Sequence, residues 1–495
     1  MAGWYAQSLI IVRYSEIGLK GARARRRMES LLRRNISAGL SASGEKCGFR
    51  WERGRLFLDG YSNSAVLYDV LSRTMGVKSF SEVVSLRFKH PDEIARKAVA
   101  LYSETVAGRK FAVRSRRAGG QNFNSVNLNV LVGDALFPFS AGVDLDNPEV
   151  EVSIEIRNDI AYFFTDTHKG PGGLPIGSEG NLVALVSGGI DSPVAAWMML
   201  KRGSPLSFVF VSLAHPVDTM DFLESLEVLT GRWSHGYDPE IHIINGRILV
   251  EKMADGNSYT APSVTFKRIL YTVAMRIAES SGSFGIVTGE SLGQVSSQTP
   301  ENLFAINHGI AFPIYRPLIG MDKDEISDLA RKIGTFPRNS RGEFCSLFSR
   351  NSIIGVTPDQ VDQDMLRYDL VSSLLSSQEI IHGSGIREYM DSLGFHDMAP
   401  QDVTGDMVVV DLRSGEKFSQ WHVPGALRAG IGDIKGIVSQ FGTGKPYVFY
   451  CQKGLQSAFA ATEARKMGAL AYYTDVEGIR RVVAKQQLQQ HLGRD

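Results

Sequence analysis

The sequence predicts a multidomain α/β protein whose largest domain contains a doubly wound parallel sheet. The chain has 495 residues, 43% of them hydrophobic and 22% charged, which is enough for about three separately cored domains. Short apolar strands alternate with helical runs from Asn181 to about residue 335, the pattern of a doubly wound sheet. A stretch rich in glycine and proline, residues 169–177, precedes this region and is typical of a linker.

Composition excludes several classes of protein. The chain has 54 Lys and Arg against 53 Asp and Glu, so net charge alone does not indicate a nucleic-acid-binding protein. The longest apolar run, residues 206–213, is too short to span a membrane, and the N-terminus lacks a secretory signal pattern. Three cysteines without a Cys-x-x-Cys pair exclude a disulfide framework and the usual zinc or iron–sulfur spacings. We therefore expect a cytoplasmic protein with no membrane partner and no metal site of its own.

Positive charge is concentrated in two clusters of the N-terminal part. Residues 1–60 contain 12 Lys and Arg against 5 Asp and Glu, an excess of +7 that lies mostly in one helix-like stretch. In residues 109–117, Phe111 and Val113 alternate with cations, as in a half-buried strand. A single cluster could be a solvated face, but two favour binding of a polyanion such as RNA. The cations that we assign to RNA binding are Lys20, Arg23, Arg26, Arg27, Lys110, Arg114 and Arg116.

The remaining N-terminal pattern is a hairpin. The run 150–156 is apolar at alternate positions and the run 160–165 is almost continuously apolar. Arg-Asn-Asp separates them, which predicts two antiparallel strands.

The glycine turn at the start of the central domain is the most informative stretch of the chain. In LVSGGIDSP, residues 185–193, a buried strand ends and a turn with Gly188 and Gly189 leads directly into a helix. Glycines permit close backbone approach, so amide N–H groups can surround an anion at the helix N-terminus. Ser187 and Ser192 add hydroxyl donors. We expect the ligand at the carboxyl end of this strand, where doubly wound sheets bind their ligands.

The pattern S-G-G-x-D-S at this position resembles the PP-loop of ATP pyrophosphatases. The resemblance implies that Ser187, Gly188, Gly189 and Ser192 cradle pyrophosphate, and that Asp191 helps to hold Mg²⁺ or orients ATP.

A second loop extends the resemblance to one family. TGESLGQVSSQ, residues 288–298, follows an apolar strand, and Lys267 lies in a helix-like run before it. Together with the first turn, these residues resemble the ThiI family of tRNA 4-thiouridine synthases. The ATP contacts that this family implies fall on Leu185, Val186, Lys267, Gly289 and Gln298.

The resemblance covers nearly the whole chain and implies four domains. EIGLKG, residues 16–21, is similar to the family's N-terminal entry. The implied domains are a ferredoxin-like domain (1–58), a THUMP domain that docks tRNA (59–167), a PP-loop domain (175–385) and a rhodanese-like α/β domain (402–490).

Two of the cysteines have implied roles in sulfur transfer. Cys451 begins the loop CQKGLQS ahead of an alanine-rich helix, where backbone amides and the helix N-terminus favour a reactive thiolate. This loop, with VVVDLR at 408–413 and WHVPGA at 421–426, resembles a rhodanese, which implies that Cys451 carries a persulfide. Cys345 could be a packed thiol, but the family resemblance implies a resolving cysteine. Cys47 matches no motif, and we interpret it as structural. Gln456 stands where rhodanese loops often carry arginine, and Lys453 is our candidate for the missing charge.

The family's reaction then implies the following sequence. ATP adenylates O4 of a tRNA uridine, expected at position 8, and pyrophosphate leaves. Cys451, loaded as a persulfide by a cysteine desulfurase, delivers sulfur to C4. Cys345 and Cys451 form a disulfide that a reductant reopens, as is usual for catalytic disulfides inside cells.

Three alternatives stay open from the sequence. The chain could thiolate another RNA base position, because the motifs do not specify the base atom. The rhodanese-like unit could serve alone as sulfur donor to the sulfur-carrier protein of thiamine thiazole synthesis, and family members can do both. The chain could also be a non-catalytic RNA-binding protein, although the intact turn argues against it. The sequence does not decide the oligomeric state, and a homodimer is one option.

Overall fold

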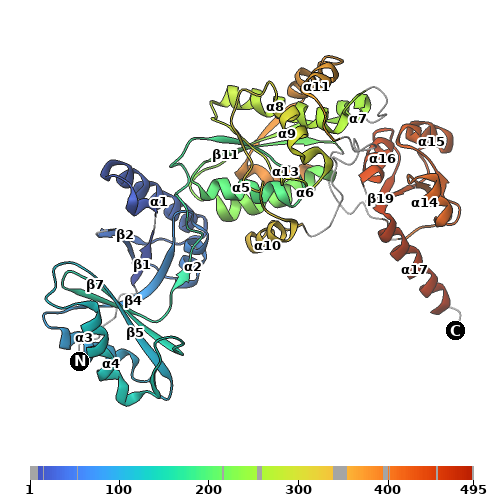
Figure 1. Cartoon of the computed structure of the whole chain (residues 1–495). Helices are drawn as coiled ribbons and strands as arrows, with labels where there is room; N and C mark the ends of the chain where they lie inside the picture. The colour runs from blue at the N-terminus through green and yellow to red at the C-terminus, as the bar shows by residue number, and fades with distance from the viewer. Residues whose placement is uncertain are drawn as a thin grey trace. The chain divides into compact units, whose positions relative to one another are not determined.

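The computed structural model describes residues 9–492 except 15, 53, 214–216, 254–258, 338–353, 394–399, 401 and 453–454 (Figure 1). Contacts divide the chain into two units. The first comprises Met1–Ser178 with the short segments Lys201–Gly203 and His235–Tyr237, and the second comprises the rest. Within the described residues, every helix is too short or too polar to cross a membrane.

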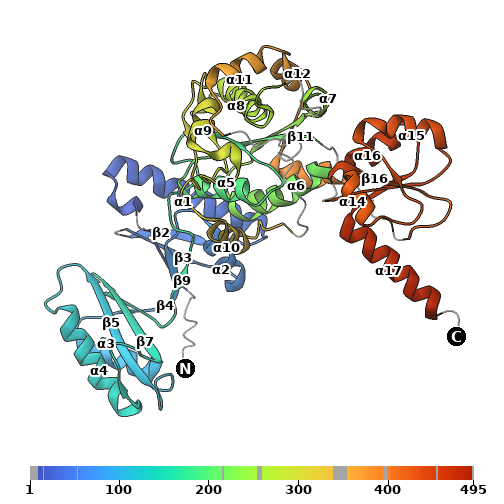
Figure 2. The same ribbon diagram turned by 45° about the vertical axis from the view of Figure 1, so that its right-hand side comes forward.

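The first unit is built on a nine-stranded sheet with the order β2-β3-β1-β4-β8-β7-β5-β6, and β9 pairs with β4. The long strand β4 is shared, because its first half pairs with β1 and its second half with β8 (Figure 2). The strands are β1 (Leu9–Arg13), β2 (Gly48–Glu52), β3 (Arg55–Asp59), β4 (Ser79–Arg87), β5 (Lys110–Ala118), β6 (Gly142–Val143), β7 (Val150–Arg157), β8 (Ile160–Phe164) and β9 (His168–Lys169).

Two helices, α1 (Ala22–Ala42) and α2 (Ser64–Arg73), cover the half of this sheet that contains β1 to β3. Helix α1 is the cationic helix predicted from the sequence, and its Leu32 and Ile36 are buried in the core. Apolar side chains of α2 and of the start of β4 belong to the same core. The core therefore continues past the boundary predicted at residue 58, because β1 pairs with β4 as well as with β3.

The other half of the first unit packs α3 (Pro91–Tyr102) and α4 (Ser125–Leu136) against β5, β7 and β8. The predicted hairpin is confirmed, since β7 and β8 pair antiparallel. Its turn holds Asn158 at φ 52°, in the left-handed region that asparagine tolerates. The stretch predicted as a linker is packed rather than free, because it begins with β9 and its Leu174 and Ile176 are buried.

The second unit contains the predicted doubly wound sheet, with the order β14-β13-β10-β11-β12-β15. The first five strands in this order are parallel, and helices cover both faces (Figure 1). The strands are β10 (Leu182–Leu185), β11 (Leu206–Ser212), β12 (Glu240–Asn245), β13 (Ile286–Val287), β14 (Ile314–Tyr315) and β15 (Gln378–His382). The helices are α5 (Asp191–Lys201), α6 (Val217–Val228), α7 (Arg247–Met253), α8 (Pro262–Ser281), α9 (Pro300–Asn307), α10 (Lys323–Ile333), α11 (Pro358–Met365), α12 (Leu370–Ser376) and α13 (Ile386–Ser392).

Strand β15 differs from the sequence prediction. Residues 357–395 read as polar and helix-rich, and they do form α11, α12 and α13, but they also contain β15, which pairs antiparallel with β12 and forms one edge of the sheet. The strand is half-exposed at the sheet edge and has no alternating apolar pattern, so its sequence carries little strand signal.

A separate four-stranded parallel sheet, with the order β17-β16-β18-β19, forms the C-terminal α/β domain. The strands predicted at 407–412 and 447–451 are confirmed as β16 and β18. The elements are β16 (Val408–Asp411), α14 (Gly415–Gln420), β17 (Leu427–Arg428), α15 (Ile434–Phe441), β18 (Tyr447–Cys451), α16 (Leu455–Lys466), β19 (Ala471–Asp475) and α17 (Val476–Leu492).

A buried carboxylate joins the two halves of the first unit. Glu155 on β7 forms ion pairs with Arg13 of β1 at 3.3 Å and with Arg55 of β3 at 2.9 Å. Arg157, on the same strand, donates a third contact of 2.9 Å. Burial alone would raise the pKa of Glu155, but the three guanidinium charges lower it, so the carboxylate is ionised.

We predict that Glu155→Gln destabilises this junction, because it leaves buried guanidinium charges without their partner. Breaking a buried ion pair in this way costs about 3–5 kcal/mol. Hydrogen exchange of β7 peptides in the full chain should report a fall of about that size in opening free energy. Glu151→Gln, on the same strand but exposed, should change it by less than about 0.5 kcal/mol. Equal protection in the two variants would contradict the role of Glu155.

Candidate functional site

One cavity of the central domain lies where the strand order reverses. Strand β10 pairs with β11 on one side and with β13 on the other, so the strand order reverses between β10 and β13 and the loops after these two strands meet at the carboxyl edge of the sheet. A cavity of about 200 Å³ opens there. It is lined by Asp191 and by all nine residues predicted for ATP: Leu185, Val186, Ser187, Gly188, Gly189, Ser192, Lys267, Gly289 and Gln298. The structure thus brings the predicted residues together, and their binding of ATP stays a prediction.

Hydrogen bonds within the glycine turn hold its shape. The Ser187 N–H donates to Ser192 Oγ at 2.8 Å, and the two serine hydroxyls lie 3.1 Å apart. The Gly189 N–H donates to Ser187 Oγ at 3.3 Å. The turn is therefore closed on itself directly before α5, which is the geometry that presents a helix N-terminus to an anion.

The second predicted loop packs directly on this turn. A Cβ atom on Gly289 would lie 2.6 Å from the Ser192 nitrogen and 2.7 Å from its Cα atom. Both neighbours are backbone atoms, so only glycine allows this approach. Gly289 thus brings loop 288–298 against the start of α5.

Asp191 is buried, and each of its carboxylate oxygens accepts a hydrogen bond. Gln294 Nε2 donates to Oδ2 at 2.9 Å, and Lys323 Nζ donates to Oδ1 at 2.8 Å. Sequence reasoning singled out neither donor. Gln294 lies within the recognised loop and could have been found, whereas Lys323 begins α10, which follows the last parallel strand.

Lys267 is also held by a carboxylate that sequence reasoning missed. Its Nζ lies 3.1 Å from Oε1 of Glu290, which is buried and also binds Arg316. Burial alone would raise the pKa of Glu290, but the charges of Lys267 and Arg316 outweigh it and lower that pKa to about 2.

Gln298 offers a free acceptor to a ligand. Its side chain is 8% exposed, and its Oε1 atom has no hydrogen-bond partner among the residues that the structure describes. A buried amide oxygen without a partner is costly, so this atom suits a ligand that donates a hydrogen bond.

The second predicted site lies in the C-terminal domain. Cys451 ends β18, is 2% exposed, and lies with its Sγ 3.5 Å from Ser457 Oγ on α16. The Ser457 hydroxyl donates to the Thr474 carbonyl at 2.8 Å, which leaves its oxygen to accept from the thiol. Cys345 and Lys453 lie outside the described residues, so their predicted roles stay predictions.

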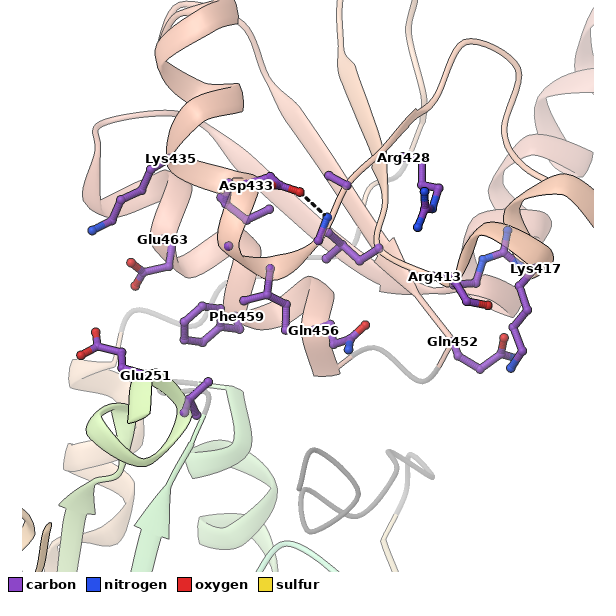
Figure 3. A pocket seen from close by; sticks show the side chains of 18 of the residues that line it. Glu251, Arg413, Lys417, Arg428, Asp433, Lys435, Gln452, Gln456, Phe459 and Glu463 are labelled. Atoms are coloured by element: carbon purple, nitrogen blue, oxygen red, sulfur yellow. Dashed lines mark hydrogen bonds between the residues drawn. The ribbon is translucent and has the colours of Figure 1, made fainter. Parts of the chain in front are cut away.

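Cations from other parts of the C-terminal domain gather beside the Cys451 loop. Figure 3 shows Gln452, the residue after Cys451, close to the side chains of Arg413 and Lys417. These three residues line one pocket together with Gln456 and Arg428. Arg413 is fixed by Asp411, whose Oδ2 lies 2.7 Å from Nη2. The sequence suggested Lys453 as the replacement for the positive charge that rhodanese loops often carry where Gln456 stands here. The described cations come instead from α14, β17 and the segment after β16.

The predicted RNA-binding cations lie on the surface of the first unit. Lys20 and the predicted arginines of α1, Arg23, Arg26 and Arg27, are exposed, and Arg27 donates to the Gly177 carbonyl at 3.2 Å. On β5, Lys110, Arg114 and Arg116 are exposed. Arg114 donates to the Leu145 carbonyl. Their binding of RNA stays a prediction.

Cys47 differs from Cys451 in its surroundings. It is half-buried, and burial is the main cause that raises its pKa to about 11. A thiol with so high a pKa is a poor nucleophile at neutral pH, which favours the structural role expected for Cys47.

Comparisons with known proteins match models over most of the chain. Residues 177–368 match the family described as "Thiamine biosynthesis protein (ThiI)", and residues 9–81 match the ThiI ferredoxin-like domain. Residues 88–166 match the THUMP domain, and residues 398–479 match the rhodanese-like domain.

Two relatives are similar to this chain over almost its whole length. A tRNA sulfurtransferase of Thermoplasma volcanium is 44% identical over 464 residues, 94% of this chain and 95% of its own. Another, of Thermoplasma acidophilum, is 41% identical over 485 residues, 97% of each chain. A crystal structure described as a 4-thiouridine synthetase–RNA complex with bound ATP is 30% identical, with a TM-score of 0.63. That match covers 76% of this chain and 99% of the other.

We predict that Gly289→Ala weakens ATP binding at the cavity, because its Cβ would push the two loops apart. Overpacking of this kind costs about 1–3 kcal/mol. The dissociation constant for ATP, measured by equilibrium dialysis, should therefore rise about tenfold. Gly231→Ala is the control, since a Cβ there meets nothing within 4 Å. Unchanged affinity in Gly289→Ala would contradict the importance of this contact.

Proposed function

The chain belongs to the family of tRNA sulfurtransferases with ThiI, THUMP and rhodanese-like domains, and from this we propose that it uses ATP to convert a tRNA uridine into 4-thiouridine. One observation carries the proposal: every residue predicted to hold ATP lines one cavity at the reversal point of the sheet. The ATP and RNA in the related 4-thiouridine synthetase structure support it.

The cavity offers a separate group for each part of the nucleotide. The backbone N–H of Gly188 and the N-terminus of α5 would bind phosphate oxygens, and Lys267 would balance their charge. Gln298 Oε1 would accept a hydrogen bond from the base. ATP, when bound, supplies the adenylyl group that turns uracil O4 into a leaving group. Mg²⁺, held mainly by phosphates, would find the Asp191 carboxylate in the same cavity.

Cys451 would deliver the sulfur. A cysteine desulfurase transfers a sulfur atom to its thiol, and the terminal sulfur of the persulfide attacks C4 of the uracil as AMP leaves. The Cys345 thiolate then attacks the Cys451 sulfur, which releases the 4-thiouridine sulfur and leaves a Cys345–Cys451 disulfide. A dithiol reductant supplies the two electrons that reopen it. Ser457, which contacts the Cys451 sulfur, would orient it in the reduced state.

The proposed tRNA surface lies on the first unit. The exposed cations of α1 and β5 would neutralise backbone phosphates, which fixes the position of the RNA without reading its sequence. We expect position 8 as the target. Thiolation of another base position is the alternative within the same reaction class.

A second role is favoured by the description of the matched family as a thiamine biosynthesis protein. We propose that Cys451 also donates sulfur to the sulfur-carrier protein of thiamine thiazole synthesis. This role would need the rhodanese-like domain and not the nucleotide cavity.

The proposed RNA surface predicts a salt effect. Arg23→Gln combined with Arg26→Gln should lower the slope of log affinity for tRNA against log salt by up to about 1.8, or about 0.9 for each phosphate that is no longer neutralised. Filter binding between 50 and 200 mM salt measures it. Arg87→Gln with Arg96→Gln removes two exposed arginines of the same unit outside the predicted clusters, and should leave the slope unchanged. Identical slopes for both double variants would rule out the α1 surface.

The proposed reaction predicts which cysteine each sulfur source requires. Nucleoside mass spectrometry of unmodified tRNA with Mg-ATP should detect 4-thiouridine from wild type, with either sulfide or a persulfide-loaded donor. Cys451→Ser and Cys345→Ser should lose product with the donor at least about a hundredfold but keep it with sulfide, because free sulfide bypasses the relay. Cys47→Ser is the control. ATP consumption without any thionucleoside would refute RNA thiolation.

The second role predicts that one variant loses tRNA thiolation alone, whereas another loses both thiolation and sulfur transfer to the carrier protein. Asp191→Asn should abolish 4-thiouridine formation yet leave sulfur transfer to the thiamine carrier protein within about twofold of wild type, since the transfer does not use the cavity. Cys451→Ser should abolish both. The carrier protein is supplied with its C-terminal carboxylate as the acyl adenylate, so that AMP leaves when the persulfide attacks and a dithiol reduces the resulting acyl disulfide. The carrier's thiocarboxylate, detected by mass, is the readout, and its loss in Asp191→Asn would contradict a role that does not use the nucleotide cavity.

A further inference from the structure

One buried carboxylate in the wall of the nucleotide cavity binds two cations. Glu290 Oε1 accepts from Lys267 Nζ at 3.1 Å, and its Oε2 accepts from Arg316 Nε at 2.7 Å. The three side chains are 6%, 12% and 13% exposed, in that order. Oε2 also accepts from the Tyr271 hydroxyl and, at 3.2 Å, from Thr288 Oγ1.

Arg316 is held firmly but lies behind the cavity wall. Its Nη2 donates to Asn307 Oδ1 at 2.6 Å and to the Tyr271 hydroxyl at 3.3 Å. Lys267, Tyr271, Thr288 and Glu290 line the cavity, and Arg316 is not among the described residues that do. Arg316 follows β14, so the last parallel strand of the sheet delivers it to this position.

The charges of this cluster do not cancel. Glu290 is ionised, and Lys267 and Arg316 bring two positive charges, so the net charge is +1. If Arg316 were absent, Glu290 would neutralise Lys267, and the cluster would offer no net charge to an anion. Because these groups are largely removed from water, a change of one charge acts strongly over a few ångströms.

We propose that Arg316 is a positioning residue that neutralises Glu290 and thereby leaves the charge of Lys267 available to the phosphates of the nucleotide. Glu290 in turn holds the Lys267 ammonium at the cavity wall. This inference rests on the proposed binding of ATP, and it assigns a role in affinity to a residue that does not touch the ligand.

The test is a set of charge variants whose affinities for two ligands are compared. Mg-ATP and adenosine are the probes, and their dissociation constants are measured on the full chain by equilibrium dialysis and competition. Arg316→Gln should raise the dissociation constant for Mg-ATP about tenfold, because the cluster loses its net positive charge. Adenosine has no phosphates, so its affinity should change by less than about twofold.

Removing the carboxylate as well should restore the charge. The double variant Glu290→Gln with Arg316→Gln has a net cluster charge of +1 again, and its affinity for Mg-ATP should return to within about threefold of wild type. Arg316→Lys, which keeps the charge, should also bind Mg-ATP with an affinity within about threefold of wild type. Arg276→Gln is the matched control, because Arg276 is an exposed arginine of α8, the helix that carries Lys267.

Each outcome has one meaning. A double variant that binds Mg-ATP as weakly as Arg316→Gln would overturn the proposal. An Arg316→Gln variant that loses as much affinity for adenosine as for Mg-ATP would also overturn it, because that loss indicates a structural defect and not a change of charge. Melting temperatures identify variants that fail to fold, and in that case the comparison of Arg316→Lys with wild type decides the proposal. Failure of wild type to bind Mg-ATP would instead refute the proposed function itself.

Discussion

The approach of Gly289 to the backbone of Ser192 is the contact on which the rest of the central site depends. The strand order reverses between β10 and β13, so the loops after these strands meet at one edge of the sheet. A side chain at position 289 would collide with the start of α5. Because residue 289 is glycine, the glycine turn before α5 and loop 288–298 pack together as one wall of the cavity. This wall places Asp191 and Gln298 in the cavity that Lys267 of α8 also lines.

The parts of this site that are local in sequence could be predicted. A buried strand, a glycine turn and a helix follow each other within residues 182–201, and the doubly wound alternation specifies which strand ends face the ligand. The hairpin of β7 and β8 and the strand that ends at Cys451 were predictable for the same reason, since each has a strong local pattern. The family resemblance added the loop around Gly289, whose own polar pattern is weak.

Other features depend on tertiary structure, and the sequence does not reveal them. Nothing in the local sequence distinguishes Arg316 and Lys323 from other cations. The last parallel strand and α10 place them beside Glu290 and Asp191. Strand β15 is polar and half-exposed, so only its pairing with β12 identifies it. The first unit does not divide at residue 58, because a single strand, β4, pairs with strands of both of its halves.

Transfer of the uracil oxygen to AMP is the central claim, and an isotope experiment tests it most directly. The tRNA would carry ¹⁸O at O4 of its target uridine and be incubated with Mg-ATP and a sulfur source, and AMP and pyrophosphate would be examined by mass spectrometry. Our account predicts one ¹⁸O atom in AMP for each 4-thiouridine formed and none in pyrophosphate, because the oxygen leaves bonded to the α-phosphorus. Unlabelled AMP accompanying full thiolation would contradict it, since ATP would then have been cleaved without activating the base.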